Sequence, residues 1–329
     1  MFRIASFQEA FASPVTIALV SAVAIVVLIG TLAIAAVAFT GRAGPEMRRE
    51  LWLRLGSWLL LLPLMILPVL AGRAWTILAV TILGILCLRE FSRATGLFRH
   101  PVVVAMVVAG LLAENFAALD HWYGFFVALP SLTLCLIAVV SIPQDHPDNY
   151  IERTGLGVFA FMLFGSGLAH LGYMANDANY RPILLMLLLC VALNDVLAFT
   201  CGKLIGGGKL LPVTSPGKTI SGALGALALN TPLIAVIAHY IFAGTPMDSW
   251  PVLIFLGALV SIAAQAGDFM LSSIKRDLGI KDMGTAIPGH GGILDRYNSL
   301  LLVAPAVFHL IAYINGVGLD QPTHLITGP

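Results

Sequence analysis

Long apolar runs separated by short polar stretches follow one another along almost the whole chain. A helix that crosses the hydrocarbon core of a bilayer needs about 20 mostly apolar residues. The pattern predicts ten such helices, at 15–40, 55–72, 74–88, 101–119, 122–142, 155–175, 181–201, 219–243, 251–271 and 298–316. The first run is longer than the apolar part of a signal peptide, so we interpret it as an uncleaved anchor.

The composition excludes a soluble protein of this length. Hydrophobic residues make up 59% of the 329 residues and charged residues only 11%, whereas a soluble domain carries about 25% charged residues. The formal net charge is +1, and no basic face is available that could bind nucleic acid. We therefore predict an all-α polytopic integral membrane protein that does not bind nucleic acid.

Lysine and arginine are distributed unevenly between the loops that alternate along ten spans. One side receives 15 of these 18 residues, and the other receives only Arg3, Arg73 and Arg181. Because positively charged loops tend to stay in the cytoplasm, we expect both termini outside and the loops 202–218 and 272–297 in the cytoplasm. Polar residues gather late in the chain, so we divide it into N-terminal scaffold helices at 1–180 and a catalytic region at 181–329.

Two aspartates interrupt apolar runs. Asp195 lies in the seventh run and Asp268 in the ninth. A carboxylate in hydrocarbon costs about 2.5–3.5 kcal/mol on insertion scales, which makes such residues candidates for function. Lys203 and Lys275 follow them by eight and seven residues, which puts both aspartates roughly 10 Å below the interface, where they could line one cavity. The alternative is that these carboxylates only join helices. We interpret Glu114 as an interfacial residue.

The segment 202–219 has a composition that suits phosphate groups. It contains three lysines, five glycines and three hydroxyl residues. Glycines let backbone N–H groups approach an anion and lysines add positive charge, while Ser215 and Thr219 can donate hydrogen bonds near the start of the next helix. The spacing is not that of a P-loop. The alternative is an ordinary positively charged loop.

The segment 272–298 mixes cations with carboxylates beside the membrane. The cations are Lys275, Arg276, Lys281 and Arg296, and the carboxylates are Asp277, Asp282 and Asp295. Carboxylates can hold Mg²⁺, which bridges phosphate oxygens, while lysine and arginine neutralise the remaining phosphate charge. The segment therefore indicates a site for a metal and a polyphosphate.

The spacing of this segment resembles the signature of the phosphatidate cytidylyltransferases, or CDP-diacylglycerol synthases. The matching residues are Ser272, Lys275-Arg276, Lys281-Asp282, the turn Pro288-Gly289-His290-Gly291-Gly292 and Asp295-Arg296. Upstream, Asp195, Gly202-Lys203, Gly208-Lys209-Leu210, Ser215-Pro216-Gly217-Lys218-Thr219 and Gly267-Asp268 resemble further motifs of the family. The chain looks closest to the longer bacterial branch, with an additional N-terminal span.

The resemblance implies transfer of CMP from CTP to phosphatidic acid, giving CDP-diacylglycerol and pyrophosphate in phospholipid biosynthesis. It implies a two-metal Mg²⁺ site with Asp268 and Asp295 as metal ligands, in the C-terminal half and facing the cytoplasm. Further catalytic candidates are Lys275, Arg276, Arg296 and His290; substrate-binding candidates are Asp195, Lys203, Ser215, Lys218, Thr219, Ser272, Lys281 and Asp282. A bacterial cytoplasmic (inner) membrane, contact with membrane lipids and a homodimer are further expectations.

Three positions depart from the family pattern. Ser221, Leu271 and Asn298 stand where many members carry a carboxylate. Two alternatives therefore stay open: a related CTP-dependent enzyme that acts on another lipid phosphate, and a weakly active or non-catalytic lipid-binding relative or transporter. A transporter would be expected to show inverted repeats with broken helices in both halves, whereas the polar residues here are concentrated in the C-terminal half.

Overall fold

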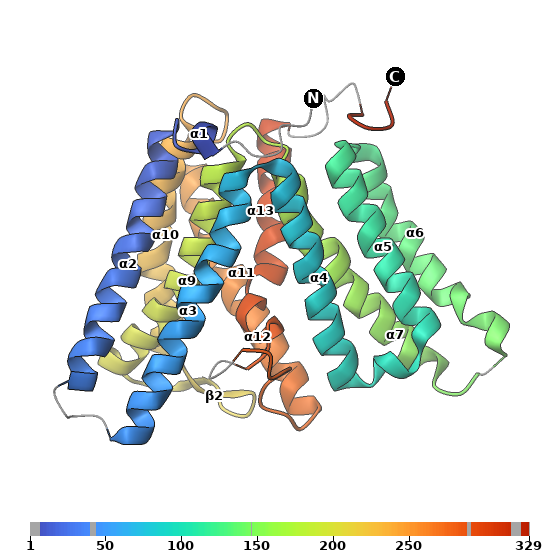
Figure 1. Cartoon of the computed structure of the whole chain (residues 1–329), viewed down its shortest axis with the longest axis horizontal. Coiled ribbons are helices and arrows are strands. Elements are labelled where there is room, and N and C mark those ends of the chain that lie inside the picture. Colours follow the sequence, from blue (N-terminus) through green and yellow to red (C-terminus); the bar gives the residue numbers. More distant parts are fainter. Residues whose placement is uncertain (1–6, 40–43, 146, 288–290, 317–323, 329) are drawn as a thin grey trace.

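The protein is a bundle of apolar helices with one small β-hairpin, as the computed structural model shows (Figure 1). The structure describes the chain apart from residues 1–6, 40–43, 146, 288–290, 317–323 and 329. Ten segments of the described chain are helical, long and apolar enough to cross a membrane. The predicted fold class and the predicted number of spans are therefore confirmed.

Several spans consist of more than one element, since α7, η3 and α8 form one span and α12 and α13 form another. The first part of the chain forms α1 (Phe7–Ala10), α2 (Pro14–Phe39), α3 (Pro45–Ala71), α4 (Arg73–Thr95), the 3₁₀ turn η1 (Leu97–Arg99), α5 (Pro101–Asp120), α6 (Tyr123–Val140), the 3₁₀ turn η2 (Ile142–Gln144), α7 (Tyr150–Ala160), a π-helical stretch η3 (Phe161–Gly167) and α8 (Leu168–Met174). The second part forms α9 (Tyr180–Ile205), β1 (Lys209–Leu211), β2 (Ser215–Thr219), α10 (Ile220–Phe242), α11 (Trp250–Asp277), α12 (Leu294–Tyr297) and α13 (Leu300–Asn315).

Several helices extend further than the apolar runs predict, among them α3, which begins at Pro45, and α4, which ends at Thr95. The helix α11 continues to Asp277, so Ser272, Lys275 and Arg276 stand on its last turns and not in a loop. The helix α9 continues to Ile205, and the rest of the predicted loop 202–218 is largely the β1–β2 hairpin. Hydropathy marks only the part of a helix that crosses hydrocarbon. It therefore misses polar turns that project beyond the bilayer.

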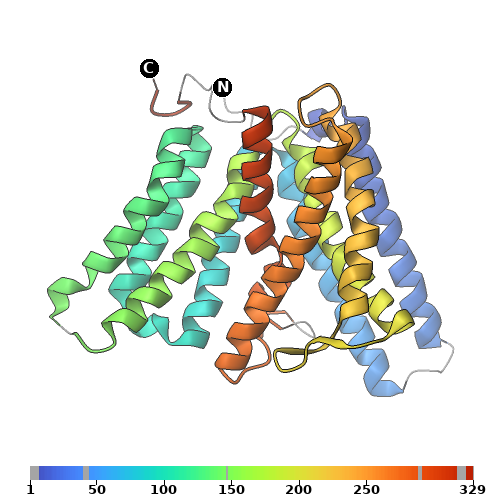
Figure 2. The same cartoon turned by 180° about the vertical axis from the view of Figure 1, so that it is seen from behind.

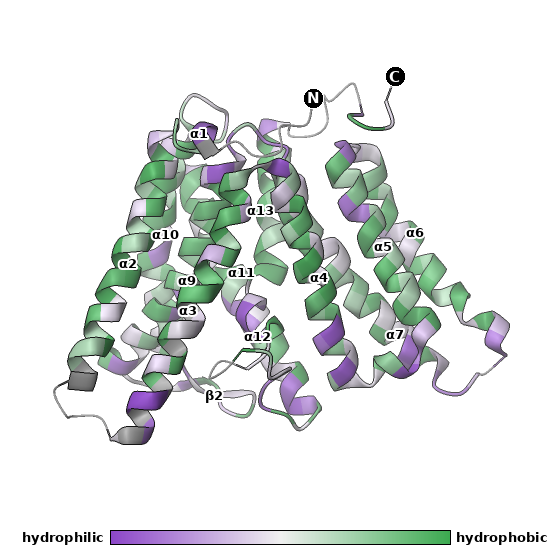
Figure 3. Ribbon diagram, in the orientation of Figure 1, coloured by the Kyte–Doolittle hydropathy of each residue, from purple (hydrophilic) through white to green (hydrophobic). Residues whose placement is uncertain are grey.

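The two ends of the bundle carry different elements. The views in Figures 1 and 2 place α1 and the last turn of α13 at one end, and the β-hairpin and α12 at the other. The hydropathy colouring in Figure 3 shows mainly hydrophobic residues along the helices and hydrophilic ones on parts of α11 and α12 and at those ends of α3 and α4 that lie on the side of the β-hairpin. The two loops predicted to share a side therefore do so, and the assignment of that side to the cytoplasm stays a prediction.

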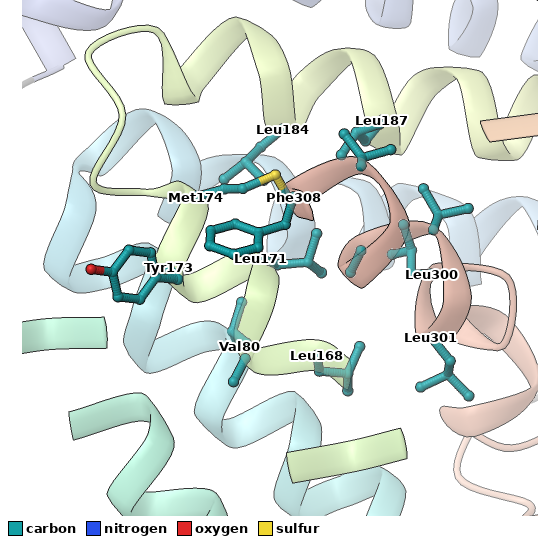
Figure 4. Close-up of a cluster of buried hydrophobic side chains, with 14 of the residues drawn as sticks. Val80, Leu168, Leu171, Tyr173, Met174, Leu184, Leu187, Leu300, Leu301 and Phe308 are labelled. Carbon is teal, nitrogen blue, oxygen red and sulfur yellow. The ribbon is translucent and has the colours of Figure 1, made fainter. Parts of the chain in front are cut away.

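An apolar core lies between α4, α8, α9 and α13. Val80, Tyr173, Leu184 and Phe308 are buried there, and Figure 4 shows their side chains converging from these four helices. In a membrane such packing stabilises by close van der Waals contact, which small residues favour. A Cβ on Gly84, for example, would lie 2.7 Å from the carbonyl oxygen of Phe164. The core joins residues before and after position 180, and the predicted division there stays a prediction.

The structure buries Glu114 completely, on α5. The interpretation of this residue as interfacial is therefore wrong. A glutamate six residues before a helix end can face either the interface or the interior, and the apolar pattern of α5 does not distinguish the two. The π-helical stretch η3 packs against α5.

Candidate active site

A cavity of about 610 Å³ lies where α9, α10 and α11 meet the β-hairpin, and we call it the polar cavity because five of its lining residues are charged. Its charged lining consists of Lys203, Lys209 and Lys218 with Asp195 and Asp268. Three lysines beside two carboxylates make a site that suits a polyanion better than a neutral ligand, because phosphate charge can be neutralised from several directions. The cavity brings together two segments that the sequence analysis singled out separately.

The hairpin takes its shape from glycines and from a cap on the following helix. Gly206 and Gly207 have positive φ angles of 70° and 104°, which glycine adopts without strain. Lys209 pairs with Thr219 across the two antiparallel strands. The Thr219 hydroxyl then accepts a hydrogen bond from the backbone N–H of Gly222 at 3.1 Å and so caps α10. These contacts hold Lys218 at the mouth of the cavity.

Asp268 stands at the centre of this arrangement. It forms an ion pair with Lys218, and its other carboxylate oxygen accepts a hydrogen bond from the Asn298 side-chain amide at 2.7 Å. The three residues come from α11, from β2 and from the residue that follows α12. Asp268 therefore joins the hairpin to the segment that precedes α13.

Asp295 lies in a second, more enclosed group of contacts. Lys275 donates to one of its oxygens at 2.8 Å, and the backbone N–H groups of Met283 and Gly292 donate to the other at 2.8 and 3.0 Å. Its side chain is only 2% exposed. Gly291 allows this arrangement, since it has a φ of 79° and a Cβ there would lie 3.0 Å from Asp282 Oδ1 and 3.1 Å from Asp295 Oδ2. Asp295 thus organises the loop between α11 and α12.

Glu90 is a residue of this site that the sequence analysis missed. It lies on α4, and its two oxygens accept hydrogen bonds from the backbone N–H groups of Ile293 at 2.9 Å and Leu294 at 2.8 Å. These N–H groups belong to the first turn of α12, where a helix has no partners of its own for them. A Cβ on Gly284 would lie 2.6 Å from Glu90 Oε1. A glutamate at the end of an apolar run resembles an ordinary interfacial charge, so no sequence signal distinguishes it.

A second cavity, of about 710 Å³, has apolar walls and one charged end. The walls are formed by α2, α3 and α9, and the charged end contains Asp268, Lys275, Asp295 and Arg296. Asp195 also lines it. Because Asp195 and Asp268 line both cavities, a polar chamber and an apolar chamber meet at these two carboxylates.

The structure distributes the remaining predicted residues over different roles. Arg276, Ser215, Ser272, Lys281 and Asp282 line neither cavity. Arg276 Nε donates to the Thr214 carbonyl oxygen at 3.2 Å and so fastens α11 to the hairpin. His290 lies outside the described residues.

The three departures from the family pattern have distinct environments. The Ser221 hydroxyl donates to the Gly206 carbonyl oxygen and closes the base of the hairpin. Leu271 is fully buried in the apolar core. Asn298 contacts Asp268, and its amide oxygen accepts a hydrogen bond from the Ser299 N–H at 2.8 Å. Asn298 therefore belongs to the site itself.

The carboxylates suit Mg²⁺ that arrives with a phosphate ligand. Among the described residues, no group of three or more histidine, cysteine, aspartate or glutamate side chains is placed to hold a metal. Mg²⁺ in phosphate-transfer sites is usually held by one or two carboxylates together with substrate phosphates and water. Asp195 and Asp268, which face both cavities, meet that requirement.

Comparison with known sequences identifies the family of the chain. The sequence model of the cytidylyltransferase family matches residues 52–314. The chain belongs to this family. The match includes every residue that lines the polar cavity, and it begins within α3, so α2 precedes it.

Individual relatives match shorter parts of the chain. A phosphatidate cytidylyltransferase of Staphylococcus aureus is 42% identical over 173 residues, covering 52% of this chain and 65% of the relative. The phosphatidate cytidylyltransferase of Staphylococcus epidermidis is 30% identical over 207 residues, covering 55% and 78%. The uncharacterized protein YnbB of Escherichia coli is 31% identical over 196 residues, covering 57% and 64%. The chain thus spans less than two thirds of the first and the third of these relatives.

Proposed function

We propose that this protein transfers the cytidylyl group of CTP to phosphatidic acid, giving CDP-diacylglycerol and pyrophosphate. The observation that carries the proposal is that two cavities meet at Asp195 and Asp268, one with three lysines beside these carboxylates and the other with long apolar walls on α2, α3 and α9. One reactant of this reaction is a water-soluble triphosphate and the other is a lipid with a phosphate headgroup. A polar chamber and an apolar chamber that share one charged junction are what such a pair of substrates requires.

The chemistry at the junction needs neutralised charge more than proton transfer. An oxygen of the lipid phosphate attacks the α-phosphorus of CTP, a new P–O bond forms, and the bond between the α-phosphorus and the bridging oxygen breaks as pyrophosphate leaves. The attacking oxygen is already anionic, so no base has to remove a proton. Bringing two anions together is the main barrier, and fixed cations and alignment lower it.

Lysines of the two cavities take separate parts in this proposal. Lys218, with Lys203 and Lys209 beside it in the polar cavity, binds the triphosphate. Lys275 and Arg296 stand at the charged end of the apolar cavity and bind the lipid phosphate. Lys218 and Lys275 are paired with Asp268 and Asp295 in the structure. Incoming phosphates compete with these carboxylates for the lysines.

Mg²⁺ is part of the proposal. Asp268 and Asp195 would hold it at the junction, and when bound it would neutralise phosphate charge and help align the reacting groups. The assignment of Asp295 as a second metal ligand stays a prediction, as does the two-metal site. In the structure both carboxylate oxygens of Asp295 accept hydrogen bonds from Lys275 or from backbone N–H groups. On the basis of the resemblance, the proposal also retains three expectations. These are contact with membrane lipids, a homodimer, and location in the bacterial inner membrane.

The proposal is tested by following labelled CTP into lipid with the purified full chain in lipid nanodiscs, with and without Mg²⁺. We expect label in CDP-diacylglycerol only when CTP, Mg²⁺ and phosphatidic acid are all present. Lys218→Ala should lower the rate at least a hundredfold. Arg99→Ala is the matched control, since Arg99 stands at the same end of the bundle but lines neither cavity.

The same assay separates the other candidate functions. Asn298 contacts Asp268 where many family members carry a carboxylate, which keeps a different lipid phosphate open as the acceptor. Incorporation with a prenyl phosphate but not with phosphatidic acid would replace the proposed acceptor. No incorporation with any lipid phosphate, by a folded protein that still binds lipid, would favour a non-catalytic relative.

A further inference from the structure

One wall of the apolar cavity is a helix that precedes the part of the chain shared with the family. Val23, Val26, Val27, Gly30 and Ile34 of α2 line this cavity. Their spacing of three and four residues places them on a single face of the helix. The stripe spans about 16 Å of helix length. The family match begins only at residue 52.

The α2 helix packs closely against the bundle only near its beginning. Thr16 and Leu19 are buried, whereas from Ser21 onward no described residue of α2 is buried. Figure 1 shows α2 at the outer edge of the bundle beside α3. The helix thus stands off from α3 and α9 over the length of its lining stripe, which leaves room between them for a flexible apolar chain.

The charged end identifies the occupant. The cavity combines apolar walls with a charged end, where Lys275 and Arg296 stand among Asp195, Asp268 and Asp295. This suits an amphiphile whose anionic headgroup binds the two cations together with the Mg²⁺ that the carboxylates would hold. A plain hydrocarbon or an apolar helix of a partner protein would fill the space between the walls and would leave the charged end without a polar ligand. Resting on the function proposed above, the occupant is an acyl chain of the lipid phosphate substrate.

The depth of each lining residue follows from the start of the helices. Glu9 of α1 and Arg181 at the start of α9 form an ion pair at 3.9 Å, so α2 and α9 begin at the same end. Gly30 and Asp195 lie almost equally far from the starts of their helices, so they stand at about the same depth. Because Asp195 lies at the charged end of the cavity, Gly30 stands at the depth of the headgroup. Val23 lies seven residues earlier, about 10 Å farther from it, at the depth of the acyl chain.

We propose that α2 is the acyl-chain selector of this protein, with Gly30 keeping the headgroup end of the cavity open and Val23 limiting the length of chain that it admits. A Cβ on Gly30 would meet no atom within 4 Å. A side chain at this position therefore starts in open space, without a clash at its first atom. A larger side chain at Val23 fills the far end and leaves the headgroup end free.

Kinetics of three variants test the proposal on phosphatidic acids with short and long chains. Val23→Phe should lower the ratio of kcat/KM for long chains to that for short chains at least tenfold. Gly30→Phe should raise KM for both lipids about equally. Ala36→Phe is the control, since Ala36 is exposed and is not part of the lining, and it should leave the ratio at its original value. An unchanged ratio in Val23→Phe would overturn the proposed role of α2.

A second measurement does not depend on activity. Phosphatidic acid with a photoreactive group at the chain end should label the peptide around Val23, and a group near the ester should label the peptide around Gly30. Excess unlabelled phosphatidic acid should suppress both. Equal labelling by a phosphatidylcholine probe would mean that bulk lipid fills the cavity and would refute the selector. If the labelling is as expected but no CMP is transferred, the proposed reaction is wrong and the lipid site stands.

Discussion

Replacement of Glu90 tests whether the scaffold helices position the site. Glu90→Ala removes two acceptors from the first turn of α12, at 2.9 and 2.8 Å from the N–H groups of Ile293 and Leu294. A hydrogen bond to a charged group contributes about 1.5–3 kcal/mol. Since water can replace part of both bonds, we expect a net loss of about 2–4 kcal/mol in the stability of this loop.

The loss should appear both in local stability and in turnover. Hydrogen exchange of the backbone amides at 291–297 should become faster, while the exchange of α5 and α6 stays the same. Asp295 is held by the N–H of Gly292, which directly precedes the two amides that Glu90 binds. If the whole loss appears in the barrier, the rate of CMP transfer should fall by about thirtyfold to several hundredfold, since every 1.4 kcal/mol is worth a factor of ten. Glu90→Gln keeps one acceptor oxygen and should recover part of the loss.

Glu152→Ala is the matched control, because Glu152 is an exposed glutamate at the beginning of a helix on the same side of the bundle. It should change neither exchange at 291–297 nor turnover. If Glu90→Ala left the exchange of 291–297 at the rate of the unaltered protein, the loop would not depend on Glu90. The reasoning would then be refuted even if activity were lost.

Three further substitutions or labelling sites have defined outcomes. Asp268→Asn should abolish CMP transfer at any Mg²⁺ concentration with little change in the thermal unfolding temperature. Asp295→Asn should lower both the transfer rate and the unfolding temperature, because it weakens contacts that hold a buried loop. Equal effects of the two variants in both assays would contradict the separate roles of the two aspartates. Asn298→Asp would place a second carboxylate against Asp268, where repulsion at 2.7 Å is worth about 6 kcal/mol at an effective dielectric of 20. We therefore expect activity only at raised Mg²⁺ concentration. Ordinary activity at low Mg²⁺ concentration would mean that position 298 does not face the phosphates. Thiol labelling of single cysteines at Ser215 and Tyr313 should occur from opposite sides of the membrane, and labelling from one side would refute the number of spans.

The apolar pattern was sufficient to predict the spans because hydrocarbon selects for it directly. The same constraint made Asp195 and Asp268 recognisable as functional candidates in the sequence, since a carboxylate in an apolar run is costly. The structure places both at the junction of the two cavities. A prediction of this kind depends on one helix at a time, and each helix carries its own signal.

Contacts between distant segments were beyond this reasoning. Glu90 binds backbone groups 203 residues away, and backbone N–H groups leave no trace in a sequence. The extension of α11 to Asp277 was missed for a related reason. The turns that carry Lys275 and Arg276 are polar and therefore resemble a loop, although they continue the helix to which the ion pairs of the site are attached.

The pairing of charges in the site affects how any substitution in it is interpreted. Lys218 is paired with Asp268 and Lys275 with Asp295, so the removal of one member leaves the other without its partner at the edge of an apolar region. Loss of activity in Lys218→Ala therefore combines lost phosphate binding with an uncompensated Asp268, and the single variant overstates the contribution of the lysine. A double-mutant cycle with Asp268→Asn, measured as CTP affinity because this variant should have no turnover, separates the two effects, since the energy that does not add belongs to the pair. Two phosphate-bearing substrates that approach such a site meet lysines whose charge is already balanced by Asp268 and Asp295. A phosphate that takes over a lysine frees the carboxylate, which then needs another cation, and Mg²⁺ bound together with the substrate would supply that charge.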